Sequence, residues 1–117
     1  MKKSVVKDKS FAFALSIVKL YQFLAEQKRE FVLSKQLLRS GTAIGALVRE
    51  ADQAESKADF IHKMAIALKE ASESDYWIDL LYQSGYLDEK TFCSIHADVD
   101  ELLKLLTRII RTTKENA

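Results

Sequence analysis

The fold is decided by residues 56–85, SKADFIHKMAIALKEASESDYWIDLLYQSG. A serine at position 56 followed three residues later by Asp59 is typical of the capping box that begins a helix. At the other end, Gly85 can take the left-handed conformation with which many helices finish. Between these signals, small or apolar side chains recur in steps of three and four at Phe60, Met64, Ala67, Ala71, Ser74, Ile78 and Leu81. This periodicity predicts one helix over residues 57–84 with a single buried face.

The segments on either side repeat the pattern. Upstream, Ser34 is a candidate N-cap for a helix over residues 34–54, whose buried seam is Leu37, Gly41, Ile44, Val48 and Ala51. Downstream, Asp88 is a candidate N-cap for a helix over residues 88–113, whose buried seam is Phe92, Ile95, Val99, Leu102, Leu106 and Ile109. Short links between helices of this length predict antiparallel neighbours.

A fourth helix is expected over residues 9–28, with Asp8 or Ser10 as its cap. Its apolar arc is wide. One stripe comprises Phe11, Leu15, Val18, Gln22 and Ala25, and the adjoining stripe comprises Ala14, Ile17, Tyr21 and Leu24. These apolar positions, with Tyr76 and Trp77 in the long central helix, exceed what one bundle core requires. A small domain with such a second stripe commonly buries it against copies of itself.

Composition agrees with an all-α fold. The chain has 117 residues, no proline and three glycines, which excludes β-sandwiches and barrels because these need frequent turn residues. We therefore expect one domain over residues 1–117, folded as an antiparallel up-down-up-down four-helix bundle. No apolar run approaches the roughly 18 residues that cross a bilayer, so no membrane association is expected. The single cysteine, Cys93, suits a reducing compartment, and we expect the cytoplasm.

Candidate catalytic groups are sparse. A carboxylate-bridged metal pair in a bundle needs a Glu-x-x-His motif on each of two helices, and only Asp59 and His62 approach that spacing. Cys93 and His96 lie one helical turn apart, with Asp100 as a possible orienting group, but such pairs are far more often packing than catalysis. We expect no catalytic residue, no metal and no cofactor.

Charge is unevenly distributed although the net charge is only +1. Residues 1–30 hold seven basic and three acidic side chains, whereas residues 56–85 hold three basic and five acidic ones. An antiparallel bundle brings the start of its first helix to the finish of its fourth. The candidate nucleic-acid-binding residues gathered there are Lys2, Lys3, Lys7, Lys9, Arg108, Arg111 and Lys114. Alternatively these cations are a solvated tail and a dipole-complementing helix end, with Asp52, Glu55 and Asp59 diluting their field.

Several stretches together resemble a known family. They are residues 37–46, LLRSGTAIGA, then Glu50-Ala51, residues 56–64, SKADFIHKM, and residues 66–71, IALKEA, followed by Tyr76-Trp77 and Leu80-Leu81. The chain resembles the four-helix-bundle proteins named after the bacterial 23S rRNA intervening sequence, some of which carry a ribosomal-protein label. The accessory variability protein of diversity-generating retroelements is similar.

The resemblance implies a ring-like homopentamer with no assigned enzyme activity. In the retroelement relatives it implies binding of nucleic acid and of a reverse transcriptase through a basic surface. Two departures weaken that implication: Leu47 stands where the family usually has Asn, and the charge is near neutral rather than basic. At the family's polar positions, Arg39 and Glu70 are expected to form structural pairings.

Two functional hypotheses follow. In the first, a homo-oligomeric bundle presents repeated basic ends to RNA or DNA, so that several weak patches hold a polyanion by avidity. In the second, the bundle is a protein-binding adapter or scaffold with no nucleic-acid role, docking its partner through exposed aromatics such as Tyr82 and Tyr86.

Overall fold

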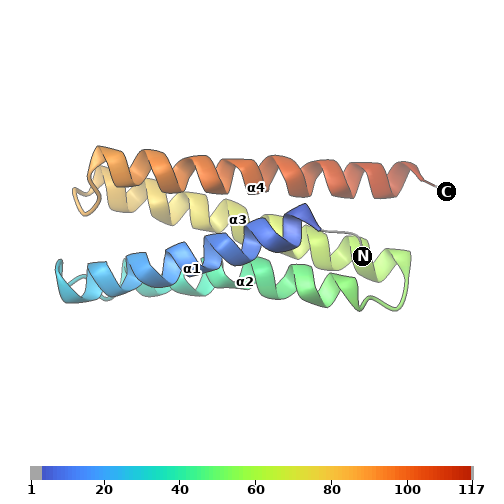
Figure 1. The fold of residues 1–117 in the computed structure, drawn as a ribbon, viewed down its shortest axis with the longest axis horizontal. Coiled ribbons are helices and arrows are strands. Elements are labelled where there is room, and N and C mark those ends of the chain that lie inside the picture. Colours follow the sequence, from blue (N-terminus) through green and yellow to red (C-terminus); the bar gives the residue numbers. More distant parts are fainter. Residues whose placement is uncertain (1–3, 117) are drawn as a thin grey trace.

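The computed structural model describes residues 4–116, and the backbone of these residues forms four helices and no strand. The helices are α1 (Val5–Glu26), α2 (Leu33–Asp52), α3 (Lys57–Gln83) and α4 (Glu89–Glu115). They run alternately up and down as an antiparallel bundle about 49 × 25 × 20 Å in extent (Figure 1). The predicted all-α four-helix bundle is confirmed.

The signals that bound α3 act as expected. The Ser56 hydroxyl accepts a hydrogen bond from the backbone N–H of Asp59 at 3.0 Å. Gly85, just beyond the helix, has a φ of +87°, which lies in the left-handed region that glycine adopts without steric penalty. At the start of α4, the Asp88 carboxylate accepts from the N–H of Thr91 at 2.7 Å. The predicted N-caps Ser56 and Asp88 and the helix-ending Gly85 are therefore confirmed.

Two predicted helix starts are wrong. Helix α1 begins at Val5, capped by the Ser4 hydroxyl, which accepts from the N–H of Lys7 at 3.3 Å. Ser10, offered as a cap, instead lies inside the helix and is buried. Helix α2 begins at Leu33, so Ser34 belongs to its first turn.

The first turn of α2 is capped by a side chain that precedes the helix. The carboxylate of Glu30 accepts hydrogen bonds from the backbone N–H groups of Val32, Leu33 and Ser34, at 3.2, 3.0 and 2.7 Å. Burial by itself would raise the pKa of Glu30, but these amide hydrogen bonds outweigh it and hold the pKa below its ordinary value of 4.5. The charged carboxylate thus accepts hydrogen bonds from backbone N–H groups that have no partner inside the helix. It also stabilises the positive end of the helix dipole.

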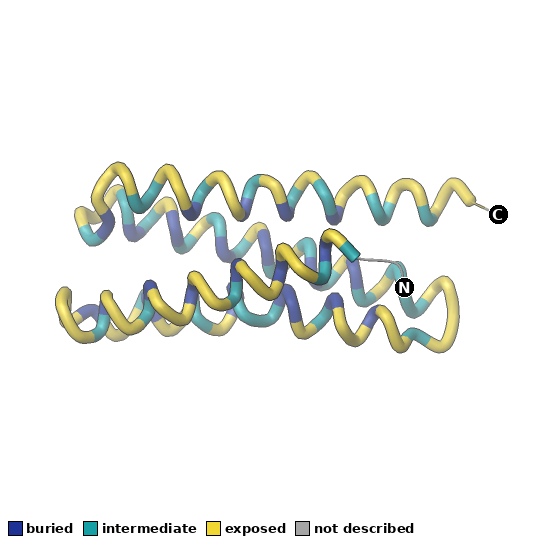
Figure 2. Tube along the Cα trace, in the orientation of Figure 1, coloured by how far each residue is buried: buried dark blue, intermediate teal, exposed yellow. Residues whose placement is uncertain are grey.

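The core runs along the bundle axis between the four helices (Figure 2). The predicted seam of α2 is buried at every position, as are all the α3 seam residues except the half-buried Phe60. In α4 the seam is buried from Ile95 to Leu106, and its two end residues, Phe92 and Ile109, are half-buried.

The first of the two apolar stripes predicted for α1 is not buried. The buried positions of α1 are Val6, Ser10, Phe13, Ile17, Leu20 and Leu24. Phe11, Leu15 and Val18 point to solvent instead. Both stripes are apolar, so periodicity alone could not distinguish the face that meets α2 and α4 from the one that does not.

Close packing of α1 on α2 explains why α2 has a glycine at position 41. A Cβ atom added at Gly41 would lie 2.9 Å from Cγ1 of Ile17, and one at Gly45 would lie 3.4 Å from the backbone oxygen of Ser10. The expected tight helix contact is therefore internal to the bundle. It holds α1 against α2 and leaves the opposite face of α1 uncovered (Figure 2).

Candidate functional site

The most conspicuous surface feature is an apolar ridge on α1. Phe11, Leu15 and Val18, hereafter the α1 ridge, lie on one helix face because they are spaced by four and three residues. Their exposed fractions are 50, 51 and 38%. Single exposed apolar residues are ordinary, but three in a row form a continuous surface of the kind that marks an interaction site.

A cation borders the α1 ridge on its α2 side. The Arg49 guanidinium carbon lies 5.1 Å from the centroid of the Phe11 ring, within the range of a cation–π contact. Arg49 is exposed, and no ion pair joins it to an acid within residues 4–116. The ridge therefore combines apolar side chains with a positive charge that has no acidic partner in the described part of the chain.

A groove opens between α1 and α4. These two helices pack much less closely than the other neighbouring pairs, so one seam of the bundle is incompletely closed. The groove has a volume of about 650 Å³, and Leu20 and Ile95 lie at its base. Its walls include Ser16 and Phe23 of α1 and Thr91, Ser94 and Asp98 of α4, and we call it the α1–α4 groove.

Asp98 is the unusual charge in the α1–α4 groove. Partial desolvation, and after it the nearby carboxylate of Glu101, raise the pKa of Asp98 above its ordinary value of 3.8. Lys9 offsets this only in part, because its ammonium pairs with Glu101 at 3.0 Å. No cation lies within ion-pair distance of Asp98 in residues 4–116.

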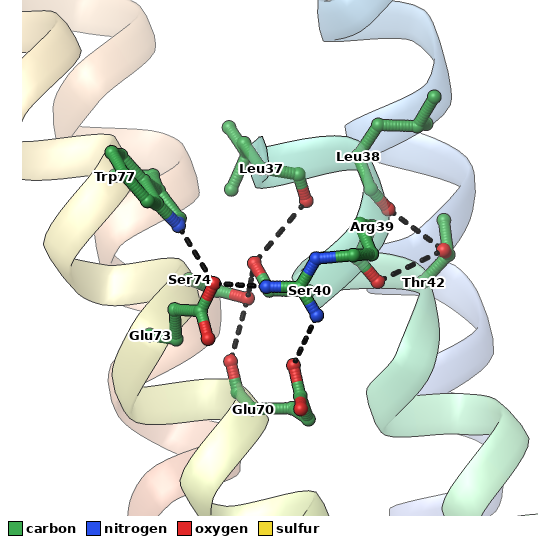
Figure 3. A network of polar contacts seen from close by, with 9 residues as sticks. All are labelled: Leu37, Leu38, Arg39, Ser40, Thr42, Glu70, Glu73, Ser74 and Trp77. Atoms are coloured by element: carbon green, nitrogen blue, oxygen red, sulfur yellow. Dashed lines mark hydrogen bonds and ion pairs between the residues drawn. The ribbon is translucent and has the colours of Figure 1, made fainter. Parts of the chain in front are cut away.

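A polar network joins α2 to α3 near the middle of the bundle (Figure 3). The Arg39 guanidinium pairs with Glu73 and, at 3.4 Å, with Glu70. Glu73 also accepts a hydrogen bond from the indole N–H of Trp77 at 3.0 Å. Behind this exposed layer, the buried Ser74 hydroxyl donates to the Ser40 hydroxyl at 2.9 Å. No buried side-chain polar atom of the network lacks a hydrogen-bond partner, and Arg39 pairs with Glu70 as expected.

The structure brings only part of the predicted basic end together. Lys2 and Lys3 lie outside the described residues. Lys7 pairs with Asp52 at 2.7 Å, and Lys9 pairs with Glu101. The pair of Lys7 with Asp52 is part of the dilution of charge expected from the sequence, whereas Glu101 was not among the acids expected at that end.

The cations of α4 remain available. Arg108, Arg111 and Lys114 are exposed, and none forms an ion pair within residues 4–116. They lie in the last turns of α4, which run past the first turn of α1 (Figure 1). We call these three residues the α4 basic end, and they are the only members of the predicted set that the described chain leaves unpaired.

The candidate chemical groups are not assembled into a reactive site. His96 Nε2 lies 3.5 Å from Asp75, not beside Asp100, which pairs with Lys104 at 3.0 Å. The suggested role of Asp100 as an orienter of His96 is therefore wrong. Cys93 is exposed, and among the described residues no three His, Cys, Asp or Glu side chains are placed to hold a metal ion.

The aromatic anchors suggested for an adapter are not free. Tyr82 stacks on Phe92 with ring centroids 4.0 Å apart, and both Tyr82 and Tyr86 are half-buried against the core. The description of these tyrosines as exposed is wrong. Tyr76 is the exposed aromatic of α3, with 59% of its surface accessible.

Comparison with known proteins decides the family. The family model for the 23S rRNA-intervening sequence protein matches residues 2–108. The chain belongs to the 23S rRNA intervening sequence protein family. A solved structure from Bacteroides thetaiotaomicron, described as a protein of unknown function from the S23 ribosomal protein family, shares 57% sequence identity. The match covers 91% of this chain and 98% of that chain, with a TM-score of 0.90. No curated protein matches the chain.

The family resemblance inferred from the two central helices is thus confirmed over nearly the whole chain. The solved structure from Bacteroides thetaiotaomicron is described as a protein of unknown function. Within residues 4–116, no helix combines the length and the hydropathy that a membrane span requires.

Two features of this family member escaped sequence reasoning. Glu30 lies in the charged stretch at which the first helix was expected to end. It precedes the start of α2 by three residues, so its carboxylate can accept hydrogen bonds from the N–H groups of the first turn of α2. This role was not predicted from the sequence. The α1–α4 groove could not be predicted from the periodicity, because periodicity shows which face of a helix is apolar but not how closely two helices pack.

Proposed function

We propose that this chain is a non-catalytic assembly module that associates with copies of itself and holds RNA or DNA on the α4 basic ends of the assembly. A closed ring of five copies is the arrangement implied by the resemblance described above. The chain's single cysteine suits a reducing compartment, so we propose that it works in the cytoplasm.

The observation that carries self-association is the α1 ridge. Phe11 and Leu15 each leave about half of their surface in solvent. Covering such apolar area stabilises an assembly by roughly 25 cal/mol per Å² removed from water. Since the bundle core is complete without these side chains, they are available to a neighbouring molecule.

Nucleic-acid binding is supported by the α4 basic end. Three cations in one protomer bind a polyanion weakly, and their repetition around a ring raises the effective concentration for every contact after the first. Phosphate contacts release condensed counterions, so the affinity must fall steeply as salt rises. An enzyme is not proposed, because the reactive groups of the described chain are dispersed.

The test is a titration of labelled structured RNA with the protein at about 50 and 200 mM salt, since phosphate contacts lose affinity strongly over that range. The proposal expects binding that weakens steeply between the two conditions. Absent or salt-independent binding would remove the nucleic-acid role while leaving the assembly role to be judged by mass.

A further inference from the structure

We propose that the α1–α4 groove binds an amphipathic carboxylate, a small molecule with one apolar chain and one carboxylate group, such as a medium-chain fatty acid. The groove has a volume of about 650 Å³, which is in the range of cavities that take small ligands. It is formed within one protomer, and none of the described residues that line it belongs to the α1 ridge. The site is therefore separate from the proposed contact between copies and does not depend on it.

The base of the groove is apolar. Leu20 of α1 and Ile95 of α4 lie there and are buried, while Phe23 of the α1 wall leaves 43% of its surface exposed. From Ser16 to Phe23 the α1 wall extends roughly 10 Å along the bundle axis, at 1.5 Å per residue. A long hollow with an apolar base suits an extended hydrocarbon chain, whose burial is favourable in proportion to the apolar area covered.

Unpaired cations lie on both walls of the groove. Lys19 belongs to the α1 wall and Lys90 to the α4 wall, and both are exposed. Lys28 lines a smaller adjoining hollow, where its ammonium lies 5.9 Å from the ring centroid of Phe23. None of the three lysines forms an ion pair within residues 4–116. Their long flexible side chains let two ammonium groups reach one ligand carboxylate.

Two acids also line the groove. The carboxylate of Asp88 already accepts a hydrogen bond from the N–H of Thr91 at 2.7 Å, as the cap of α4. Hydrogen bonds from Thr91, and after them the charges of Lys90 and Lys28, lower the pKa of this carboxyl. Asp98 lies toward the opposite end, and partial desolvation raises its pKa. The Asp88 end of the groove thus has more cations than acids and favours an anion.

This distribution of charge orients the ligand. Its carboxylate lies between Lys19 and Lys90, and its chain covers the apolar base. A chain that approaches Asp98 desolvates that carboxylate further, so Asp98 opposes binding and limits the length of the chain. Glu26 and Glu89, two exposed acids at the same end of the bundle as Lys90, line neither hollow and do not occupy the place of the ligand carboxylate.

Titration calorimetry of the purified wild-type protein tests the proposal with three probes. Decanoate has both the chain and the carboxylate, acetate has only the carboxylate, and decyltrimethylammonium has the same chain with the opposite charge. We expect decanoate to bind at one site per chain and the other two probes to bind at least about tenfold more weakly. Absent or multi-site binding of decanoate would overturn the proposal, as would equally tight binding of the cation.

Charge variants give changes of opposite sign. Lys19→Gln and Lys90→Gln should each weaken decanoate binding roughly threefold to tenfold, whereas Asp98→Asn should tighten it about twofold or more. Lys69→Gln, at an exposed position of α3 outside the groove, is the matched control and should bind like wild type. Circular dichroism verifies that each variant remains helical. Lysine variants that bind like wild type, or an Asp98→Asn variant that does not bind more tightly, would contradict the site.

A second copy of the chain is the competing occupant of the groove. Leu15→Asp, which alters the α1 ridge and not the groove, distinguishes the two occupants. Equal decanoate affinity in wild type and in this variant supports a site within one protomer. Binding to the variant alone would show that a neighbouring copy fills the groove and would overturn the proposal. The salt-dependent RNA titration does not involve the groove, so the nucleic-acid role and this site are refuted independently.

Discussion

Gly41 of α2 faces Ile17 of α1 so closely that a Cβ atom at position 41 would lie 2.9 Å from Cγ1 and 3.0 Å from Cγ2 of Ile17. Ile17 is fully buried. The absence of a side chain at position 41 therefore sets the distance between α1 and α2. The close approach places Ile17, which is on the buried face of α1, directly against α2.

The first prediction compares the two glycines of α2. Gly41→Ala forces overpacking against Ile17, whereas Gly45→Ala places its methyl group 3.4 Å from the nearest atom, an ordinary contact. Both substitutions gain the helix propensity that alanine has over glycine. Gly41→Ala should be less stable than Gly45→Ala by about 1–2 kcal/mol in urea unfolding. Equal stabilities would show that α1 and α2 separate readily.

The second prediction concerns the cap of α2. Glu30→Gln removes the charge that three backbone N–H groups share and should lower the free energy of unfolding by about 1–2 kcal/mol near pH 7. The pKa of Glu30 is depressed in the folded protein, so its contribution is complete above 4.5 and is lost as the pH falls through the folded value. The difference between wild type and variant should therefore shrink in acid.

Urea unfolding of both proteins from pH 7 down to pH 3 measures this difference. Glu26→Gln is the matched control, because Glu26 is an exposed carboxylate at the end of the preceding helix. A difference between wild type and Glu30→Gln that stays constant across the acid range would contradict the assigned role of the charge.

The sequence was sufficient to predict the four-helix architecture, for two reasons. Ser56, Asp88 and Gly85 are local signals whose partners lie within a few residues, so no tertiary information was needed to place them. In α2 and α4 one stripe is clearly more apolar than the others, and that stripe is buried.

The buried face of α1 could not be predicted in the same way, because this helix is apolar on two sides. The spacing of Phe11, Leu15 and Val18 is as regular as that of Phe13, Ile17 and Leu20. Only the packing of α1 against its neighbours, including the close approach of Ile17 to Gly41, distinguishes them. The ion pairs of Lys7 and Lys9 could not be predicted for a related reason, since they depend on which acids the neighbouring helices bring within reach.

The third prediction concerns the network of Figure 3. Arg39 keeps about half of its side chain in solvent, so its ion pairs with Glu70 and Glu73 are screened by water. Arg39→Gln should cost less than about 1 kcal/mol of stability and leave both assembly and RNA binding unchanged. A large loss of oligomer mass in this variant would instead place Arg39 at a contact between copies.

The fourth prediction separates the α4 basic end from the paired lysines. Replacing Arg108, Arg111 and Lys114 with glutamine should weaken binding of structured RNA and flatten its salt dependence, by roughly one unit of slope for each phosphate that is no longer neutralised. Replacing Lys7 and Lys9 with glutamine is the control, and should have a much smaller effect because both lysines already pair with acids. Equal effects of the two sets would indicate a diffuse field rather than a site.

The central claim is that the working unit is an assembly of copies joined through the α1 ridge, and its most direct test is the mass of the purified protein in solution. Multi-angle light scattering at micromolar concentration should give a defined multiple of the 13.3 kDa chain, and Leu15→Asp should reduce it to one chain that remains helical. A wild-type protein that is folded and monomeric under the same conditions would contradict the account.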